Sequence, residues 1–228
     1  MKTRMIAFYL YFIACIVTMI SIMAEWETMI LISKPVIIPT IYFYYLTKTK
    51  SPNLLFSIII LLNFIGDSIV LLRLDNTLYL MIPYFFAYLL MLRFVIKDIS
   101  GIKHNPTNVL LSVGVMALLA VIVWIVLDIQ SEDGMSLLPP MIVYGIVLCA
   151  LVTLAAYNYF ADGSISSFYM LMACACAWGS DIFYVIYNLH FHIPVLNYIN
   201  SSLQYITYFF LVKYMIARKR PISAKHSF

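Results

Sequence analysis

The stretch LNFIGDSIVLLRL, residues 62–74, decides the fold class because it places a carboxylate, Asp67, inside an otherwise apolar run. An Asp near the centre of a bilayer costs about 2.5 to 3.5 kcal/mol of insertion free energy. A membrane helix tolerates that cost when other helices cover the carboxyl. We therefore expect residues 62–74 to belong to a spanning helix inside a larger bundle.

The composition of the whole chain indicates the same environment. Of the 228 residues, 64% are hydrophobic and only 11% are charged, and the mean hydropathy is +0.97. Soluble globular domains are far less apolar. We expect one integral membrane domain over residues 1–228, with no room for a separate soluble domain.

Eight segments are long and apolar enough, or nearly so, to cross a bilayer, which takes roughly 20 residues per helix. They are 5–23, 28–46, 53–74, 77–97, 108–129, 136–157, 165–188 and 194–216. The expected fold is therefore an all-α bundle of eight transmembrane helices. The third segment contains FIGDSIVLL and the seventh contains AWGSDIFYVI. This similarity suggests two parallel four-helix repeats, with chance similarity as the open alternative.

Basic residues collect at alternate helix ends, which the positive-inside rule assigns to the cytoplasm. They are Lys2, Arg4, Lys48, Lys50, Lys97, Lys103 and those of the basic tail 217–228, whereas the opposite ends hold only Arg73. Both termini are predicted to be cytoplasmic, in a multi-pass protein of the inner cell membrane. The predicted cytoplasmic loop 158–164 carries no Lys or Arg. Arg93 and Lys213 are expected to extend to the membrane interface.

Neither a metal, nor a cofactor, nor nucleic acid is indicated. The net charge of +4 is spread over connectors and the tail, and no CxxC spacing occurs among the four cysteines, Cys15, Cys149, Cys174 and Cys176. His190 and His192 lie more than two helical turns from Asp181, so a solvated loop is favoured over a metal site. GDSI matches the start of a serine esterase motif, but Ser68 lies in mid-helix without the exposing turn.

Three ionisable side chains are expected at one depth in the outer half of the bundle. A rise of about 1.5 Å per residue places Asp67 and Asp181 at similar depths, with Lys34 reaching the same layer. Pro35 frees a backbone carbonyl and bends the helix beside Lys34. Further polar groups in reach are Tyr144, Tyr205 and Tyr208. Such a cluster indicates a functional site; the structural alternative is an Asp-Lys pair that only holds helices together.

Five stretches together resemble the YhhN-type lysoplasmalogenase family of multi-spanning membrane proteins. They are SKPVIIP (33–39), GDSIVLL (66–72), PPMIVYG (139–145), SDIFYVIY (180–187) and YITYFFL (205–211). The family has Lys-Pro in its second helix, Gly-Asp in its third, Ser-Asp in its seventh and Thr-Tyr in its last. The matching residues are Lys34 and Pro35, Gly66 and Asp67, Ser180 and Asp181, and Thr207 and Tyr208.

Two departures from the family pattern stand out. The usual histidine of the fourth helix is absent, and IPYFFAYLLML offers only Tyr84 and Tyr88. The glutamine that usually follows the last-helix tyrosine is replaced by Val212 or Lys213. If the histidine takes part in the chemistry, this chain has a changed substrate or no activity.

The resemblance implies cleavage of the vinyl ether of a lysoplasmalogen to a fatty aldehyde and a glycerophospho-alcohol, without a cofactor. Proton delivery to carbon gives an oxocarbenium ion, which water captures. Burial disfavours the charged form of a carboxyl, and two neighbouring carboxyls resist double ionisation. Asp67 and Asp181 are therefore expected to divide the acid and base roles, in either order. Lys34 keeps the ionised partner charged or meets the lipid phosphate, and the other supporting residues are Tyr144, Tyr208, Ser180 and Gly66.

Two other function classes stay open at this point. A transporter or channel would use Asp67, Asp181 and Lys34 as a proton or cation relay. A lipid-binding protein would hold amphiphiles without flux or turnover. In each case the expected partners are lipids, a lysophospholipid substrate and the surrounding membrane, rather than nucleic acid.

Overall fold

The computed structural model describes residues 2–72, 77–102, 105–129, 138–189 and 191–218, and these ranges contain eight α-helices and no strand. The helices are α1 (Lys2–Met23), α2 (Glu27–Lys48), α3 (Leu54–Leu71), α4 (Thr77–Ile99), α5 (Pro106–Ile129), α6 (Leu138–Asp162), α7 (Ile165–Leu189) and α8 (Pro194–Arg218). Seven of them, α1 to α7, are long and apolar enough to cross a membrane. The predicted all-α class is thus confirmed for the described part of the chain, and its apolar helices fit a multi-pass membrane protein, although seven rather than eight of them have the length and composition of a span.

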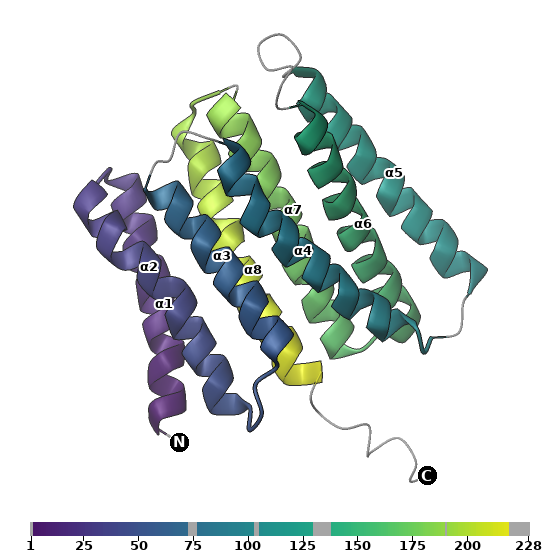
Figure 1. The fold of residues 1–228 in the computed structure, drawn as a ribbon, viewed down its shortest axis with the longest axis horizontal. Coiled ribbons are helices and arrows are strands. Elements are labelled where there is room, and N and C mark those ends of the chain that lie inside the picture. The colour runs from purple at the N-terminus through teal and green to yellow at the C-terminus, as the bar shows by residue number, and fades with distance from the viewer. Residues whose placement is uncertain (1, 73–76, 103–104, 130–137, 190, 219–228) are drawn as a thin grey trace.

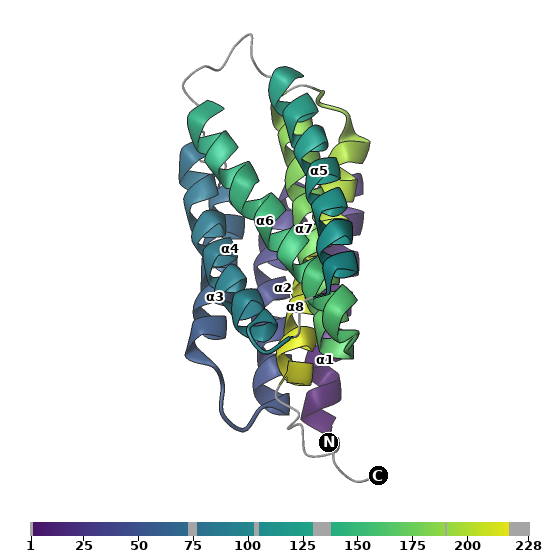
Figure 2. The ribbon, with the colours of Figure 1, turned by 90° about the vertical axis from the view of Figure 1, so that its right-hand side faces the viewer.

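The helices form antiparallel hairpins around a four-helix centre. Helices α3, α4, α7 and α8 lie in the middle, with α1 and α2 on one side and α5 and α6 on the other (Figure 1). The most extensive packing joins α7 to α8, α1 to α2, α3 to α4 and α5 to α6. Helix α1 begins and α8 ends at the same end of the bundle, which we call the terminal end; the opposite end is the far end (Figure 2).

Apolar side chains cover the outside as well as the interior of the bundle. Helix α5 is the most apolar of the seven candidate spans, and it exposes Leu110, Leu118 and Trp124. An apolar outer face is expected where a helix contacts lipid. In contrast, α8 carries a run of polar residues near its start, Asn197, Asn200, Ser201, Ser202 and Gln204. These polar residues lower its apolar character below that of the other helices.

Local sequence signals set several helix ends. The Asn53 side chain accepts a hydrogen bond from the backbone nitrogen of Phe56 at 3.2 Å, which caps the start of α3. Helix α5 begins with Pro106, a position where the missing N–H costs nothing. The expected last residue of the third segment, 74, lies outside the described residues. Of the predicted tail, 217 and 218 belong to α8 and 219–228 are not described.

The predicted end of the sixth helix at residue 157, and with it the loop 158–164, is wrong. Helix α6 continues to Asp162 because Asn158 is buried against the bundle instead of facing water. Gly163 then adopts a positive φ of 61° that side chains with a Cβ disfavour. Ser164 caps α7 by accepting from the backbone nitrogen of Ser167 at 3.2 Å, so the connection is reduced to two residues.

Candidate functional site

Asp67 lies in the centre of the bundle, 6% exposed, and accepts three hydrogen bonds. Its Oδ1 accepts from the Tyr84 hydroxyl and from Gln204 Nε2, each at 2.5 Å. Its Oδ2 accepts from the Tyr208 hydroxyl at 2.9 Å. Gln204 Nε2 also donates to the Tyr84 oxygen at 2.9 Å. Because every partner donates to it, Asp67 is fully satisfied as an ionised carboxylate.

Asp181 is held by two tyrosines through a single oxygen. Its Oδ2 accepts from Tyr88 at 2.8 Å and from Tyr144 at 2.6 Å. The rings of Tyr88 and Tyr144 pack edge to face, with centroids 5.7 Å apart. Among the described residues, Oδ1 of Asp181 has no hydrogen-bond partner, unlike both oxygens of Asp67. The second carboxyl is therefore fixed in position but has one oxygen available to a ligand.

Helix α4 connects the two carboxyls. Tyr84 donates to Asp67 and Tyr88 donates to Asp181. Residues four apart on a helix lie about 6 Å apart along its axis and on the same face. One face of α4 therefore holds both carboxyls in one layer of the bundle, as the sequence predicts for the two aspartates.

The hydrogen bonds are also crossed between the two halves of the chain. Asp67 of α3 accepts from Tyr208 of α8, whereas Asp181 of α7 accepts from Tyr88 of α4. If α3 corresponds to α7 and α4 to α8, these are two copies of one interaction. The correspondence is the one that two parallel four-helix repeats would give.

Gly66 lets Tyr84 reach the carboxyl. A Cβ added at Gly66 would lie 2.6 Å from Cζ of the Tyr84 ring, far inside a normal carbon-carbon contact of about 3.5 to 4.0 Å. The ring thus lies directly on the backbone of α3, one residue before Asp67. Gly66 therefore supports the site by leaving room for the Tyr84 ring.

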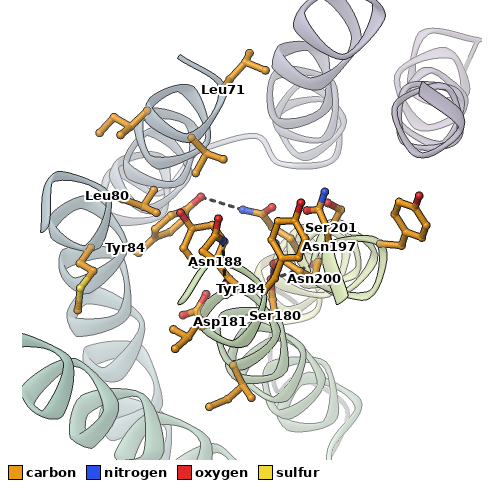
Figure 3. Close-up of a pocket in the computed structure, with 18 of the residues that line it drawn as sticks. Leu71, Leu80, Tyr84, Ser180, Asp181, Tyr184, Asn188, Asn197, Asn200 and Ser201 are labelled. Carbon is orange, nitrogen blue, oxygen red and sulfur yellow. Dashed lines mark hydrogen bonds between the residues drawn. The ribbon is translucent and has the colours of Figure 1, made fainter. Parts of the chain in front are cut away.

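A cavity of 1120 Å³ lies toward the far end and is lined by residues of all eight helices. Figure 3 shows Tyr84 of α4 and Asp181 of α7 pointing toward a common space. The walls combine apolar side chains such as Leu80 and Leu148 with polar ones. The labelled polar side chains on the α7 and α8 side are Ser180, Tyr184, Asn188, Asn197, Asn200 and Ser201 (Figure 3). A mixed wall of this kind suits an amphiphile.

The predicted site residues fall into two groups around this cavity. Those that line it are Lys34, Tyr144, Ser180 and Asp181. Those that lie behind the wall are Gly66, Asp67 and Tyr208, all buried. Lys34 is half-buried in α2 and attracts the Asp67 carboxylate electrostatically. The layer of carboxyls and lysine expected from the sequence is thus present, but only one of its two carboxyls faces the cavity.

Two predicted residues have other roles. The Ser180 hydroxyl donates to the side-chain and backbone oxygens of Asn200, at 2.7 and 3.1 Å, and so joins α7 to α8. The sequence predicts that Tyr205 reaches the polar layer, but its side chain bonds to neither carboxyl. Its backbone oxygen accepts from the Tyr11 hydroxyl instead.

Three residues of the site are missing from the sequence-based set: Tyr84, Tyr88 and Gln204. The sequence-based prediction considered a glutamine only after Tyr208, where Val212 and Lys213 stand, whereas Gln204 lies one turn before Tyr208 and donates to Asp67. The spacing gives a signal for all three. Tyr84 and Tyr88, like Gln204 and Tyr208, are four residues apart and thus share a helix face.

Within the described ranges no three His, Cys, Asp or Glu side chains gather closely enough to hold a metal ion. His190 lies outside those ranges.

No model of a known protein family, no curated protein and no solved structure matches this chain.

Proposed function

We propose that this chain is a membrane-embedded hydrolase that cleaves the vinyl ether of a lysophospholipid, with Asp181 as the proton donor. One observation carries the proposal. Asp181 lines a cavity of amphiphile size, two tyrosines hold it through Oδ2, and Oδ1 is left for the substrate. A vinyl ether requires a positioned acid, because the first step of its hydrolysis moves a proton to carbon.

The reaction proceeds in three steps. Asp181 gives its proton to the vinyl carbon farther from the ether oxygen, which leaves an oxocarbenium ion at the other vinyl carbon. Water adds to that cation and returns a proton to Asp181. The resulting hemiacetal collapses to a fatty aldehyde and a glycerophospho-alcohol. The reaction is a hydrolysis: one water is consumed, the bond between the vinyl carbon and the glycerol oxygen breaks, and no electrons are transferred to an acceptor.

Asp67 acts from behind the cavity wall as a fixed negative charge. Its oxygens accept three hydrogen bonds, and Tyr84 and Gln204 separate it from the cavity that they line. A preorganised anion one side chain away stabilises the developing oxocarbenium ion. Asp67 is thus a positioning and electrostatic residue, and it contacts the substrate only through Tyr84 and Gln204.

Lys34 supplies the recognition of the lipid phosphate in this proposal. Its side chain, on α2, lines the same cavity as Asp181 of α7. A half-buried ammonium group attracts an anionic head group more strongly than one in bulk water does. The vinyl ether would then lie near Asp181 while the phosphate faces Lys34.

The membrane topology forms part of the proposal. All eight helices cross the bilayer, as two parallel four-helix repeats, with both termini in the cytoplasm of a cell whose inner membrane holds the protein. The crossed bonds of Asp67 with Tyr208 and of Asp181 with Tyr88 support the repeats. The alternation of basic connectors supports the orientation. The cavity then opens toward the outer leaflet.

The missing histidine of the fourth helix does not remove the acid from this scheme. The corresponding helix carries Tyr84 and Tyr88, and both donate to a carboxyl. The changed residue is expected to alter which head group or chain is accepted. The proposal therefore keeps the YhhN-type resemblance and expects this chain to differ from that family in the lysolipid that it accepts.

The test compares two substrates on the purified protein in detergent. A lysolipid with a vinyl ether should release fatty aldehyde, whereas the same lysolipid with a saturated ether should not. The vinyl bond is the only difference between them. Folded protein that releases no aldehyde would contradict the proposal. If the same protein carried protons or cations across liposomes along a gradient, the transporter alternative would replace it.

A further inference from the structure

A second site lies at the terminal end, far from the cavity, where two lysines share one aromatic ring. Lys48 Nζ lies 5.7 Å from the centre of the Tyr44 ring, and Lys213 Nζ lies 5.9 Å from the same centre. The ammonium groups are close enough to repel each other. Neither is paired with a carboxylate among the described residues.

The Lys213 ammonium is further enclosed by two phenylalanines. Its distance to the ring centre is 5.7 Å for Phe8 and 5.3 Å for Phe209. The Phe8 and Tyr44 rings are 5.1 Å apart and so close one side of the cage. Cations are stabilised over aromatic faces within about 6 Å. This cage holds Lys213 in place beside Lys48, although the two positive charges repel.

We propose that Lys48 and Lys213 bind the phosphate of an anionic membrane phospholipid. The charges complement each other, because a single anion between two confined ammonium groups removes their repulsion. The depth also fits, since Lys48 ends α2 and basic groups at helix ends meet lipid head groups. The neighbouring face of α1 exposes Met5, Tyr9 and Phe12, which offer contact to an acyl chain.

This site is independent of the proposed hydrolysis. It involves α1, α2 and α8 at the terminal end, whereas the cavity lies toward the far end. Head-group charge, and not ether chemistry, determines what binds there. A lipid bound between these helices would brace the α1–α2 hairpin against α8.

The experiment measures retention of phosphatidylglycerol and of phosphatidylcholine by the full chain in detergent, using native mass spectrometry. The wild type should retain phosphatidylglycerol preferentially. The double variant Lys48→Gln with Lys213→Gln should lower that affinity about 30-fold, since each lysine near a membrane surface contributes a factor of about five. The matched control replaces Lys50 and Lys97, both exposed, by Gln and should retain the preference.

Lys48→Gln alone removes an exposed side chain and should fold normally, so it tests the site even if the double variant is unstable. It should give an intermediate loss of phosphatidylglycerol. Equal loss in the Lys50 and Lys97 control would overturn the proposal, as would a wild type without preference between the two lipids. Displacement of the lipid by soluble glycerol phosphate at equal concentration would assign the site to a free phosphate instead.

Discussion

Replacing Gly66 by Ala should destabilise the bundle even though alanine is the better helix former. The added Cβ would lie 2.6 Å from Cζ of Tyr84. Since carbon atoms pack at about 3.5 to 4.0 Å, the ring has to move by about 1 Å. That movement lengthens the 2.5 Å bond from the Tyr84 hydroxyl to Asp67.

The size of the effect follows from three contributions. Overpacking a well-filled interior costs about 1 to 3 kcal/mol. Weakening a hydrogen bond to a charged group costs about 1.5 to 3 kcal/mol. The helix propensity of Ala over Gly returns about 1 kcal/mol. The free energy of unfolding should therefore fall by about 1.5 to 5 kcal/mol, measured by reversible unfolding in mixed micelles of rising SDS content.

A matched control separates the clash from propensity. A Cβ at Gly114 in α5 meets nothing within 4 Å, so Gly114→Ala should stabilise by about 1 kcal/mol. With Tyr84→Ala already in place, Gly66→Ala should likewise be neutral or stabilising, because the ring it meets is gone. If Gly66→Ala stabilises the otherwise wild-type chain, the close approach of α3 and α4 is refuted.

Three smaller perturbations test the supports around the site, each by the same unfolding measurement. Ser180→Ala removes two bonds to Asn200 and should cost about 1 to 2 kcal/mol while leaving KM unchanged; a raised KM would place Ser180 on the substrate. Tyr214→Phe removes a 2.5 Å hydrogen bond to Asp98 and should lower the free energy of unfolding by about 1.5 to 3 kcal/mol. An unchanged free energy of unfolding would contradict a stabilising bond between α4 and α8. Asn53→Ala should cost about 1 kcal/mol, and Asn53→Ser should restore it, through the cap of α3.

Much of this architecture can be predicted from the sequence because the bilayer restricts the choice. Apolar runs of about 20 residues identify helices, and all eight expected segments have a helix at their place. Counting residues along each helix predicts the depth of the polar layer and places Asp67 and Asp181 close together. The ends of the helices are harder to predict. The predicted loop 158–164 begins at Asn158, yet this residue is buried and α6 continues past it.

The side-chain partners of the carboxyls are beyond such counting. Whether Tyr84 or Tyr88 faces an aspartate depends on the rotation of α4 and on its packing against α6 and α3, which hydropathy does not encode. Gln204 could be found by asking which polar residue shares a helix face with Tyr208. The unequal exposure of Asp67 and Asp181 needs the assembled bundle, because both occur in similar apolar runs.

The most direct test of the central claim follows the proton that Asp181 is proposed to deliver. The purified protein is given a vinyl-ether lysolipid in D₂O, and the released aldehyde is trapped at once as an oxime and weighed by mass spectrometry. The wild type should give aldehyde carrying one deuterium on the carbon next to the carbonyl. Asp181→Asn, folded as judged by its unfolding profile, should slow release about 100- to 10,000-fold. Aldehyde without deuterium, or wild-type release by Asp181→Asn, would contradict the proposed mechanism.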